Sequence, residues 1–194
     1  IKMLPKTNNG SFDAATGGNV TLGSGAKLVM PANAVTDASG NAYTGNVNVA
    51  MTWIDPSSAE LPYTLMGDLR GVLTNGAERG LSTFGMIGVE LTGGTGQPLK
   101  VAAGKTADLS FPIPASLLSA APDSIDLWHF DEATARWKQE GKAGKTGTMY
   151  IAKVSHFSFW NCDAPFPLID LCMSFKDSHG AALINAQIRI KRLV

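Results

Sequence analysis

Short apolar runs separated by glycine and proline constrain the fold of this chain more than any other feature. The sequence holds 21 glycines and 10 prolines, spread along its whole length. Runs of four to eight residues bounded by turn residues are typical of β-strands, whereas helices need longer uninterrupted stretches. The best helical candidate, residues 115–120, follows two prolines and is long enough for one turn only. The sequence therefore predicts an all-β fold.

The clearest strand lies at residues 45–54, where Val47, Val49, Met51 and Trp53 alternate with polar or small residues. A period of two predicts a strand with one buried face. Further strands are predicted at 19–22, 26–30, 68–73, 85–91, 99–102, 107–111, 124–130, 136–140 and 149–154. Nine or ten strands joined by short loops predict an antiparallel two-layer β-sandwich.

Three regions are expected along the chain. Residues 1–10 are predicted to be the tail of a preceding domain or a linker, with a turn at 8–11. Residues 11–163 are predicted to form the β-sandwich module. Residues 164–194 contain two alternating runs around the turn sequence KDSHGA and predict the first hairpin of a second β domain. We therefore expect an internal piece of a longer protein, whose signal and anchor lie outside this segment.

The composition excludes several classes of protein. Sixteen basic residues balance sixteen acidic ones, charged residues make up 16%, and hydrophobic residues make up 44%. This balance argues against a disordered chain and against a nucleic-acid partner. No apolar run approaches the roughly 20 residues that cross a bilayer, so this segment is not expected to insert into a membrane. No glycine-rich segment leads into a helix, which argues against a phosphate cradle.

Two groups of residues have the types found in metal sites, and four tryptophans have the type found in sugar-binding sites. His129, Asp131 and Glu132 lie at a strand-to-turn junction without a ligand spacing typical of metal sites, and are interpreted as solvated turn residues. The loop DASGN at Asp37 lacks a downstream bidentate acid and is interpreted as a turn. The four tryptophans are expected to be core residues, and Trp137 is the best candidate for an exposed one. The sequence predicts neither a metal site nor a cofactor.

Several ordered blocks carry a resemblance to a known family. They are GGNVTL, AKLVMPANAV, YTGNVNVAMTWIDP, GDLRGV, FGMIGVEL, DLWHFDEATARWKQEG and VSHFSFWNCDAPFPL. Residues 11–168, which contain them, resemble a β-sandwich module of Bacteroidetes-type surface proteins, in which carboxypeptidase-regulatory-like domains flank the module. More distantly, the blocks are similar to the β-sandwich of ankyrins, netrin receptors and self-cleaving death-domain proteins.

The resemblance implies a cell-surface, outer-membrane or secreted module with a structural or adhesive role and no enzymatic activity. The expected partners are neighbouring domains of the same chain, and a protein or glycan at the cell surface. Exposed aromatic residues would serve a glycan- or protein-binding role. The resemblance also implies that Ser124, in the triplet Asp123-Ser124-Ile125, matches an O-glycosylation pattern.

The self-cleaving relatives suggest an alternative activity at the tripeptide His156-Phe157-Ser158. In those relatives the serine hydroxyl of HFS attacks the preceding carbonyl. Here Ser158 would attack Phe157, with His156 or a cross-strand group such as His129 as the base. The alternative interpretation is that His156 is a hydrogen-bonded structural residue and Ser158 a polar residue between aromatics.

Cys162 and Cys172 are the only two cysteines, ten positions apart. Two arrangements are open. A disulfide between them would clamp the junction between the sandwich and the following domain and contribute about 2–3 kcal/mol. Alternatively, they are two free thiols on separate strands, because a bridge requires Cα atoms within about 7 Å.

Overall fold

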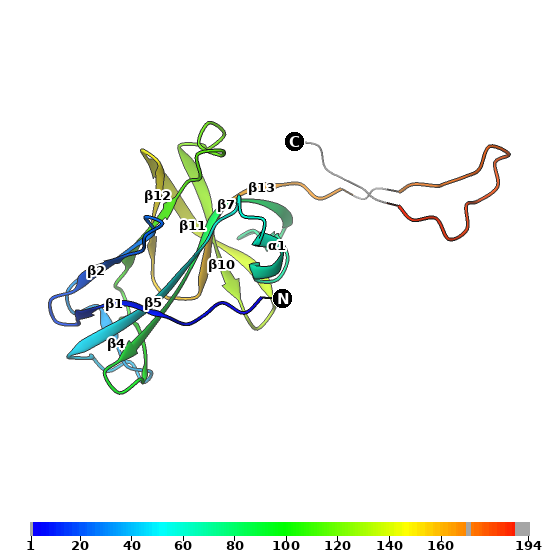
Figure 1. Cartoon of the computed structure of the whole chain (residues 1–194). Helices are drawn as coiled ribbons and strands as arrows, with labels where there is room; N and C mark the ends of the chain where they lie inside the picture. Colours follow the sequence, from blue (N-terminus) through cyan, green and yellow to red (C-terminus); the bar gives the residue numbers. More distant parts are fainter. Residues whose placement is uncertain (1, 170–171, 189–194) are drawn as a thin grey trace.

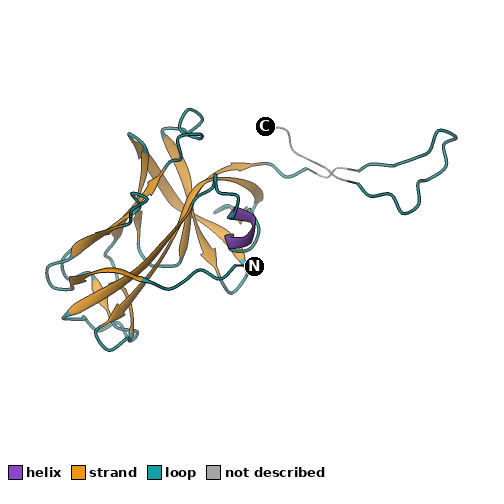
Figure 2. Cartoon of the chain, in the orientation of Figure 1, coloured by secondary structure: helices purple, strands orange, loops and turns teal. Residues whose placement is uncertain are grey.

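The computed structural model describes residues 2–169 and 172–188 of the chain, and nearly all of its regular structure is β-strand (Figures 1 and 2). The elements are β1 (Asn8–Asp13), β2 (Gly18–Thr21), β3 (Lys27–Met30), β4 (Val35–Thr36), β5 (Asn46–Ile54), α1 (Leu61–Thr64), β6 (Arg70–Val72), β7 (Glu78–Gly93), β8 (Pro98–Val101), β9 (Ala107–Pro112), β10 (Ser124–Asp131), β11 (Arg136–Thr146), β12 (Met149–Val154) and β13 (Phe159–Phe166). The predicted all-β, antiparallel, sandwich-like fold is confirmed.

The strands form one large sheet in the order β1-β5-β7-β13-β10-β11-β12-β9-β3-β2. Neighbours along this path pair antiparallel. Its two ends, β1 and β2, are consecutive in sequence and meet at the bridge between Asp13 and Gly17. The sheet therefore curls back until its two halves face each other, which produces the sandwich seen in Figure 2.

The main core fills the space between the two halves of the sheet. It includes fully buried side chains from most of the strands, among them Leu28, Val49, Ile87, Leu109, Phe111 and Trp160. Each such side chain contributes about 1.5–3 kcal/mol by leaving water. The ion pairs mostly join exposed side chains, as between Lys153 and Asp108, and pairs of that kind contribute at most about 1 kcal/mol. Apolar burial therefore dominates the stability of the sandwich.

A second apolar cluster lies on the opposite face of the central strands. It contains Trp128 and Phe130 of β10, Trp137 of β11, and Leu81 and Met86 of β7. The segment that runs from α1 to β6 packs against it with partly buried side chains, including Leu61, Leu65, Met66 and Leu69. The prediction that Trp137 is the best exposed tryptophan is wrong, because this covering segment leaves Trp137 with no exposed surface. Trp128 and Trp160 are equally buried, as predicted.

The ends of the sandwich differ from the predicted boundaries. Residues 8–11, predicted as a turn, belong to β1, which pairs with β5. Phe12 packs into the main core and the Asn9 side chain accepts a hydrogen bond from the Met51 N–H at 2.6 Å, so this edge belongs to the sandwich. At the other end, β13 continues past residue 163 to Phe166, and Ala164 pairs with Ser82.

Beyond β13, the region predicted to begin a second β domain contains no strand in its described residues 167–169 and 172–188. Residues 172–188 are all exposed. One bridge between Lys176 and Ala182 closes a turn in which the Asp177 carboxylate accepts from the His179 and Ala181 N–H groups. The segment therefore folds back on itself locally. The rest of the predicted hairpin, residues 189–194, lies outside the described residues.

The cysteines are free thiols in this structure, and no disulfide joins Cys162 to Cys172. Cys162 is fully buried in the main core on β13, whereas Cys172 is exposed. Burial raises the pKa of the Cys162 thiol well above its ordinary value, which keeps the thiol neutral and unreactive. Of the two arrangements left open by the sequence, the structure has the free thiols.

A buried polar network occupies β13 on the face opposite Cys162. The Thr83 hydroxyl donates to the Asn161 side-chain oxygen at 2.7 Å, and the Asn161 amide donates to one Asp163 carboxylate oxygen at 2.7 Å. The other Asp163 oxygen is buried without a hydrogen-bond partner. Burial raises the pKa of Asp163 well above its ordinary value. The neutral, protonated form is therefore the one that suits this site.

Substituting Gly71 tests the packing of the second cluster. A Cβ on Gly71 would lie 2.5 Å from Trp128 Cζ3 and 3.0 Å from Leu81 Cδ1. Because Trp128 has no room to move, we expect Gly71→Ala to destabilise the protein by about 1–3 kcal/mol in urea denaturation. Gly144→Ala is the matched control, since no atom lies within 4 Å of the Cβ position there. Equal stability of the two variants would show that the second cluster is loosely packed.

The buried Asp163 leads to a second prediction, which concerns the pH dependence of the free energy of unfolding. A folded-state pKa above the unfolded value of 3.8 means that the native state binds more protons, so stability falls as the pH rises above about 4. In that window the loss approaches about 1.4 kcal/mol per pH unit. We expect Asp163→Asn to gain stability relative to wild type progressively from pH 4 to 7 in urea denaturation. Parallel profiles for wild type and Asp163→Asn would refute the role of Asp163.

Candidate functional site

The tripeptide singled out in the sequence lies in the turn between β12 and β13, at residues 155–158. The Trp160 indole N–H donates to the His156 carbonyl at 3.1 Å, and the Ser158 carbonyl accepts from the Val89 N–H at 3.5 Å. The turn is thus tied to the main core on one side and to β7 on the other. The backbone of the turn is therefore held in place by Trp160, a core residue, and by Val89 of β7.

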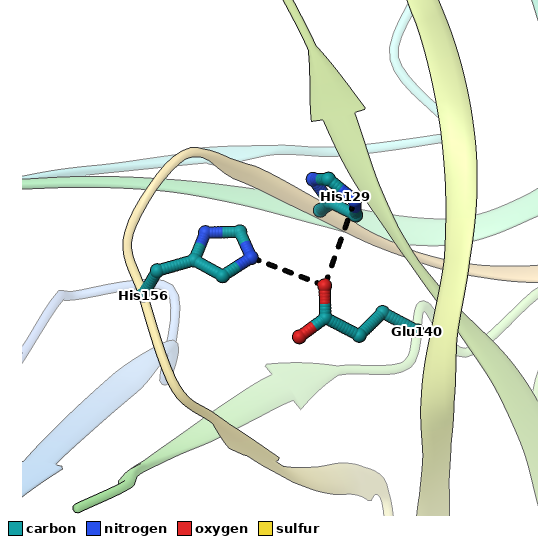
Figure 3. Close-up of side chains that lie close together, drawn as sticks. All are labelled: His129, Glu140 and His156. Carbon is teal, nitrogen blue, oxygen red and sulfur yellow. Dashed lines mark hydrogen bonds and ion pairs between the residues drawn. The ribbon is translucent and has the colours of Figure 1, made fainter. Parts of the chain in front are cut away.

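Two histidines and one glutamate meet beside this turn (Figure 3). His156 comes from the turn, His129 from β10 and Glu140 from β11. One carboxylate oxygen, Glu140 Oε2, lies 3.1 Å from His156 Nε2 and 3.5 Å from His129 Nε2. The three ligand-capable atoms all lie within 4.8 Å of one another. We refer to these three residues as the His–Glu–His cluster.

A β-bulge brings Glu140 into the cluster. Trp128 pairs with Gln139 and Asp126 with Lys142, so β11 has one more residue than β10 between these pairs. The extra length falls at Glu140 and Gly141, and Gly141 has a φ of 88°, which glycine adopts readily. Bulges re-aim side chains and are common beside functional sites.

Ring-to-ring contacts orient the two histidines, and one hydroxyl orients the Glu140 carboxylate. The His156 ring lies 4.8 Å from the Trp160 ring and 4.9 Å from the His129 ring, centroid to centroid. The Ser155 hydroxyl donates to the second Glu140 oxygen at 3.3 Å. The side chains of His129, Glu140 and His156 are 20%, 43% and 41% exposed, so solvent reaches the cluster.

Electrostatics favour a neutral His129. Burial lowers the pKa of this imidazole, and the neighbouring His156 lowers it further, while Glu140 opposes the shift. Lys138, directly across the strand pair from His129, is held in an ion pair with Asp131. A neutral imidazole has a lone pair that can bind a proton or a metal ion.

Two of the groups proposed for self-cleavage, the Ser158 hydroxyl and His156 Nε2, have other hydrogen-bond partners in the structure. The Ser158 hydroxyl donates to the carbonyl of the residue that follows it, Phe159, at 3.1 Å. The Nε2 atom of His156 faces Glu140. Left-handed backbone conformations among described residues other than glycine occur at Asn33, Ala135 and Asn185, so the Phe157–Ser158 peptide does not carry strain of this kind.

A cavity of about 210 Å³ lies against the tripeptide, and Phe157, Ser158 and Phe159 are among its lining residues. Its other walls come from the N-terminal segment, β5 and β7, and include Leu4, Lys6, Thr52, Gly88 and Glu90. Lys6 and Glu90 form an ion pair between largely exposed side chains. The cavity is therefore partly polar.

Asp131 and Glu132, the carboxylates near His129 in sequence, were interpreted as solvated turn residues, and the carboxylate that meets His129 is Glu140. Asp131 accepts from Thr134 and pairs with Lys138, which together lower its pKa to about 2. Glu132 is exposed. Glu140 is the last residue of the predicted strand 136–140. The one sequence signal that could have identified it as a site residue is its position two residues after Lys138, on the same exposed face of that strand.

The remaining candidates lie on the surface. Ser124, at the start of β10, is exposed, as a modification site requires. The Asp37 carboxylate accepts from the Ser39 and Asn41 N–H groups and from the Asn41 side chain, and these hydrogen bonds lower its pKa. The interpretation of this loop as a turn is confirmed.

The chain shows similarity to one kind of curated protein and to no family model. No family model matches the chain. The chain is similar to cartilage intermediate layer protein 2 of mouse, with 29% identity over 154 residues, which is 76% of this chain and 13% of that protein. It is 28% identical over 125 residues to the human protein of the same name, covering 63% of this chain and 10% of that protein. The chain thus spans a small fraction of the length of these relatives. No solved structure matches.

Proposed function

We propose that the chain is a non-catalytic β-sandwich module of a multidomain extracellular protein, acting as a spacer or an interaction domain. The observation that carries this proposal is the match to cartilage intermediate layer protein 2, in which 76% of this chain aligns with only 13% of the mouse protein. A unit that recurs as a small part of a much longer chain is typical of modular proteins.

The name of these relatives assigns them to the intermediate layer of cartilage, a tissue composed largely of extracellular matrix. An extracellular location is therefore proposed for this chain. None of the helices in the described residues is long and apolar enough to cross a membrane. Attachment to an outer membrane, and the Bacteroidetes-type assignment, stay predictions from the sequence resemblance.

The surface that fits an interaction role lies after β13. Among described residues, several large apolar side chains are exposed in this region: Leu168, Ile169, Met173, Phe175, Leu183, Ile184 and Ile188. Apolar residues gathered in one exposed segment mark an interaction site. We propose that they pack against a neighbouring domain of the same protein, in line with the predicted second β domain at residues 164–194. The described tryptophans are mainly buried, so a tryptophan platform for sugars has little support.

Truncation tests the modular organisation. Because residues 172–188 are exposed throughout, a chain that ends at Leu168 should unfold within about 2 °C of the full chain in thermal melts. The full chain should also self-associate more in sedimentation measurements, since only it carries the exposed apolar segment. A large fall in the melting temperature of the short chain would contradict the proposal that the sandwich is an independent unit.

The self-cleavage alternative is tested on the purified chain. Because the Ser158 hydroxyl engages Phe159 and His156 engages Glu140, we expect a single intact band of 20.4 kDa on a denaturing gel. Ser158→Ala should give the same band. Fragments ending at Phe157 and beginning at Ser158, abolished by Ser158→Ala, would establish self-cleavage and overturn the non-catalytic assignment.

A further inference from the structure

We propose that His129, Glu140 and His156 bind a divalent transition-metal ion, with zinc as the best-matched ion. Neither histidine belongs to the two apolar clusters, and Glu140 lies on a bulge that places its carboxylate between the two imidazoles. Two imidazole nitrogens and one carboxylate oxygen are a donor set that zinc sites use, with a further position left for water or another ligand.

The distances between the donor atoms agree with this assignment. Ligands about 2.0–2.1 Å from a tetrahedral zinc ion stand about 3.4 Å apart. In the structure Glu140 Oε2 lies 3.1 Å from one imidazole nitrogen and 3.5 Å from the other. All three atoms lie within 4.8 Å of one another, so small side-chain rotations suffice to enclose an ion.

The surroundings of the cluster suit a metal site as well. Ser155 donates to the second oxygen of Glu140, and Trp160 holds the His156 backbone and stacks on its ring. Outer contacts of this kind orient the ligands of metal sites. The partial exposure of all three side chains gives an ion a path from solvent.

The three ligands come from β10, β11 and the turn between β12 and β13. A bound ion would therefore join three neighbouring segments of the chain. An ion that binds only the folded state stabilises that state in proportion to the logarithm of its concentration over Kd. Nitrogen donors favour zinc and its neighbours over the hard cations calcium and magnesium.

The test is a calorimetric titration of zinc chloride into the full chain carrying Cys172→Ser, which removes the exposed thiol as a competing ligand. We expect one ion per chain, and no heat from calcium or magnesium. Thermal melts should rise by roughly 5–10 °C at a free zinc concentration a hundred times Kd.

Substitutions at the proposed ligands test whether the ion binds at the His–Glu–His cluster. Glu140→Gln keeps a side-chain oxygen that can accept hydrogen bonds from both histidines, but it removes the negative charge. If Glu140 serves only as a hydrogen-bond acceptor, this variant should be as stable as the parent protein. We expect Glu140→Gln and His156→Ala each to weaken zinc binding by at least about a hundredfold, since even outer contacts of zinc sites contribute 10- to 100-fold. His179→Ala and Glu132→Gln are matched controls and should bind as the parent does.

Zinc binding of unchanged affinity in Glu140→Gln and His156→Ala, or its loss in His179→Ala, would place the ion elsewhere and overturn the proposal. Absence of any calorimetric signal or thermal shift with zinc would overturn it as well. Neither result depends on whether the module acts as a spacer or an interaction domain, because the readout is the ion alone.

Discussion

The fold depends on burying both faces of its central strands. In β13, Trp160 and Cys162 face the main core, while Asn161 and Asp163 lie buried on the opposite face. In β10, Leu127 belongs to the main core and Trp128 to the second cluster. The middle of each of these strands thus has buried side chains on both faces. This constraint explains why the stretch VSHFSFWNCD combines aromatic, polar and thiol side chains without regular alternation.

The strands with a single buried face were predictable from sequence, because period-two alternation directly reports such burial. Val47, Val49 and Met51 of β5 are examples. The second cluster was not predictable in the same way. Trp137 stands between Arg136 and Lys138 and so looks exposed, but the segment around α1 covers it, and sequence periodicity within β11 carries no trace of a loop that packs there.

The candidate site was predictable only in part. From the sequence, His156 and His129 were alternative candidates for the base that would activate Ser158, and their meeting in one cluster was not predicted. The sequence did not name Glu140, because a bulge shifts the register of β11 against β10 and the sequence does not show which residue the bulge will turn. β1 was missed for a related reason. Its residues NNGS read as a turn, whereas an asparagine side chain bonds to the neighbouring strand and an adjacent phenylalanine fills the core.

The orientation of His156 bears on both activities considered for this turn. Its Nε2 atom is directed at Glu140, and its ring is held between His129 and Trp160. To act as the base for Ser158, His156 would have to turn its Nε2 atom away from Glu140 and lose its ring contact with Trp160. A metal ligand needs no such rearrangement, because the nitrogen already faces the oxygen with which it would share the ion. The contacts that direct His156 away from Ser158 are therefore the same contacts that would suit it to bind a cation.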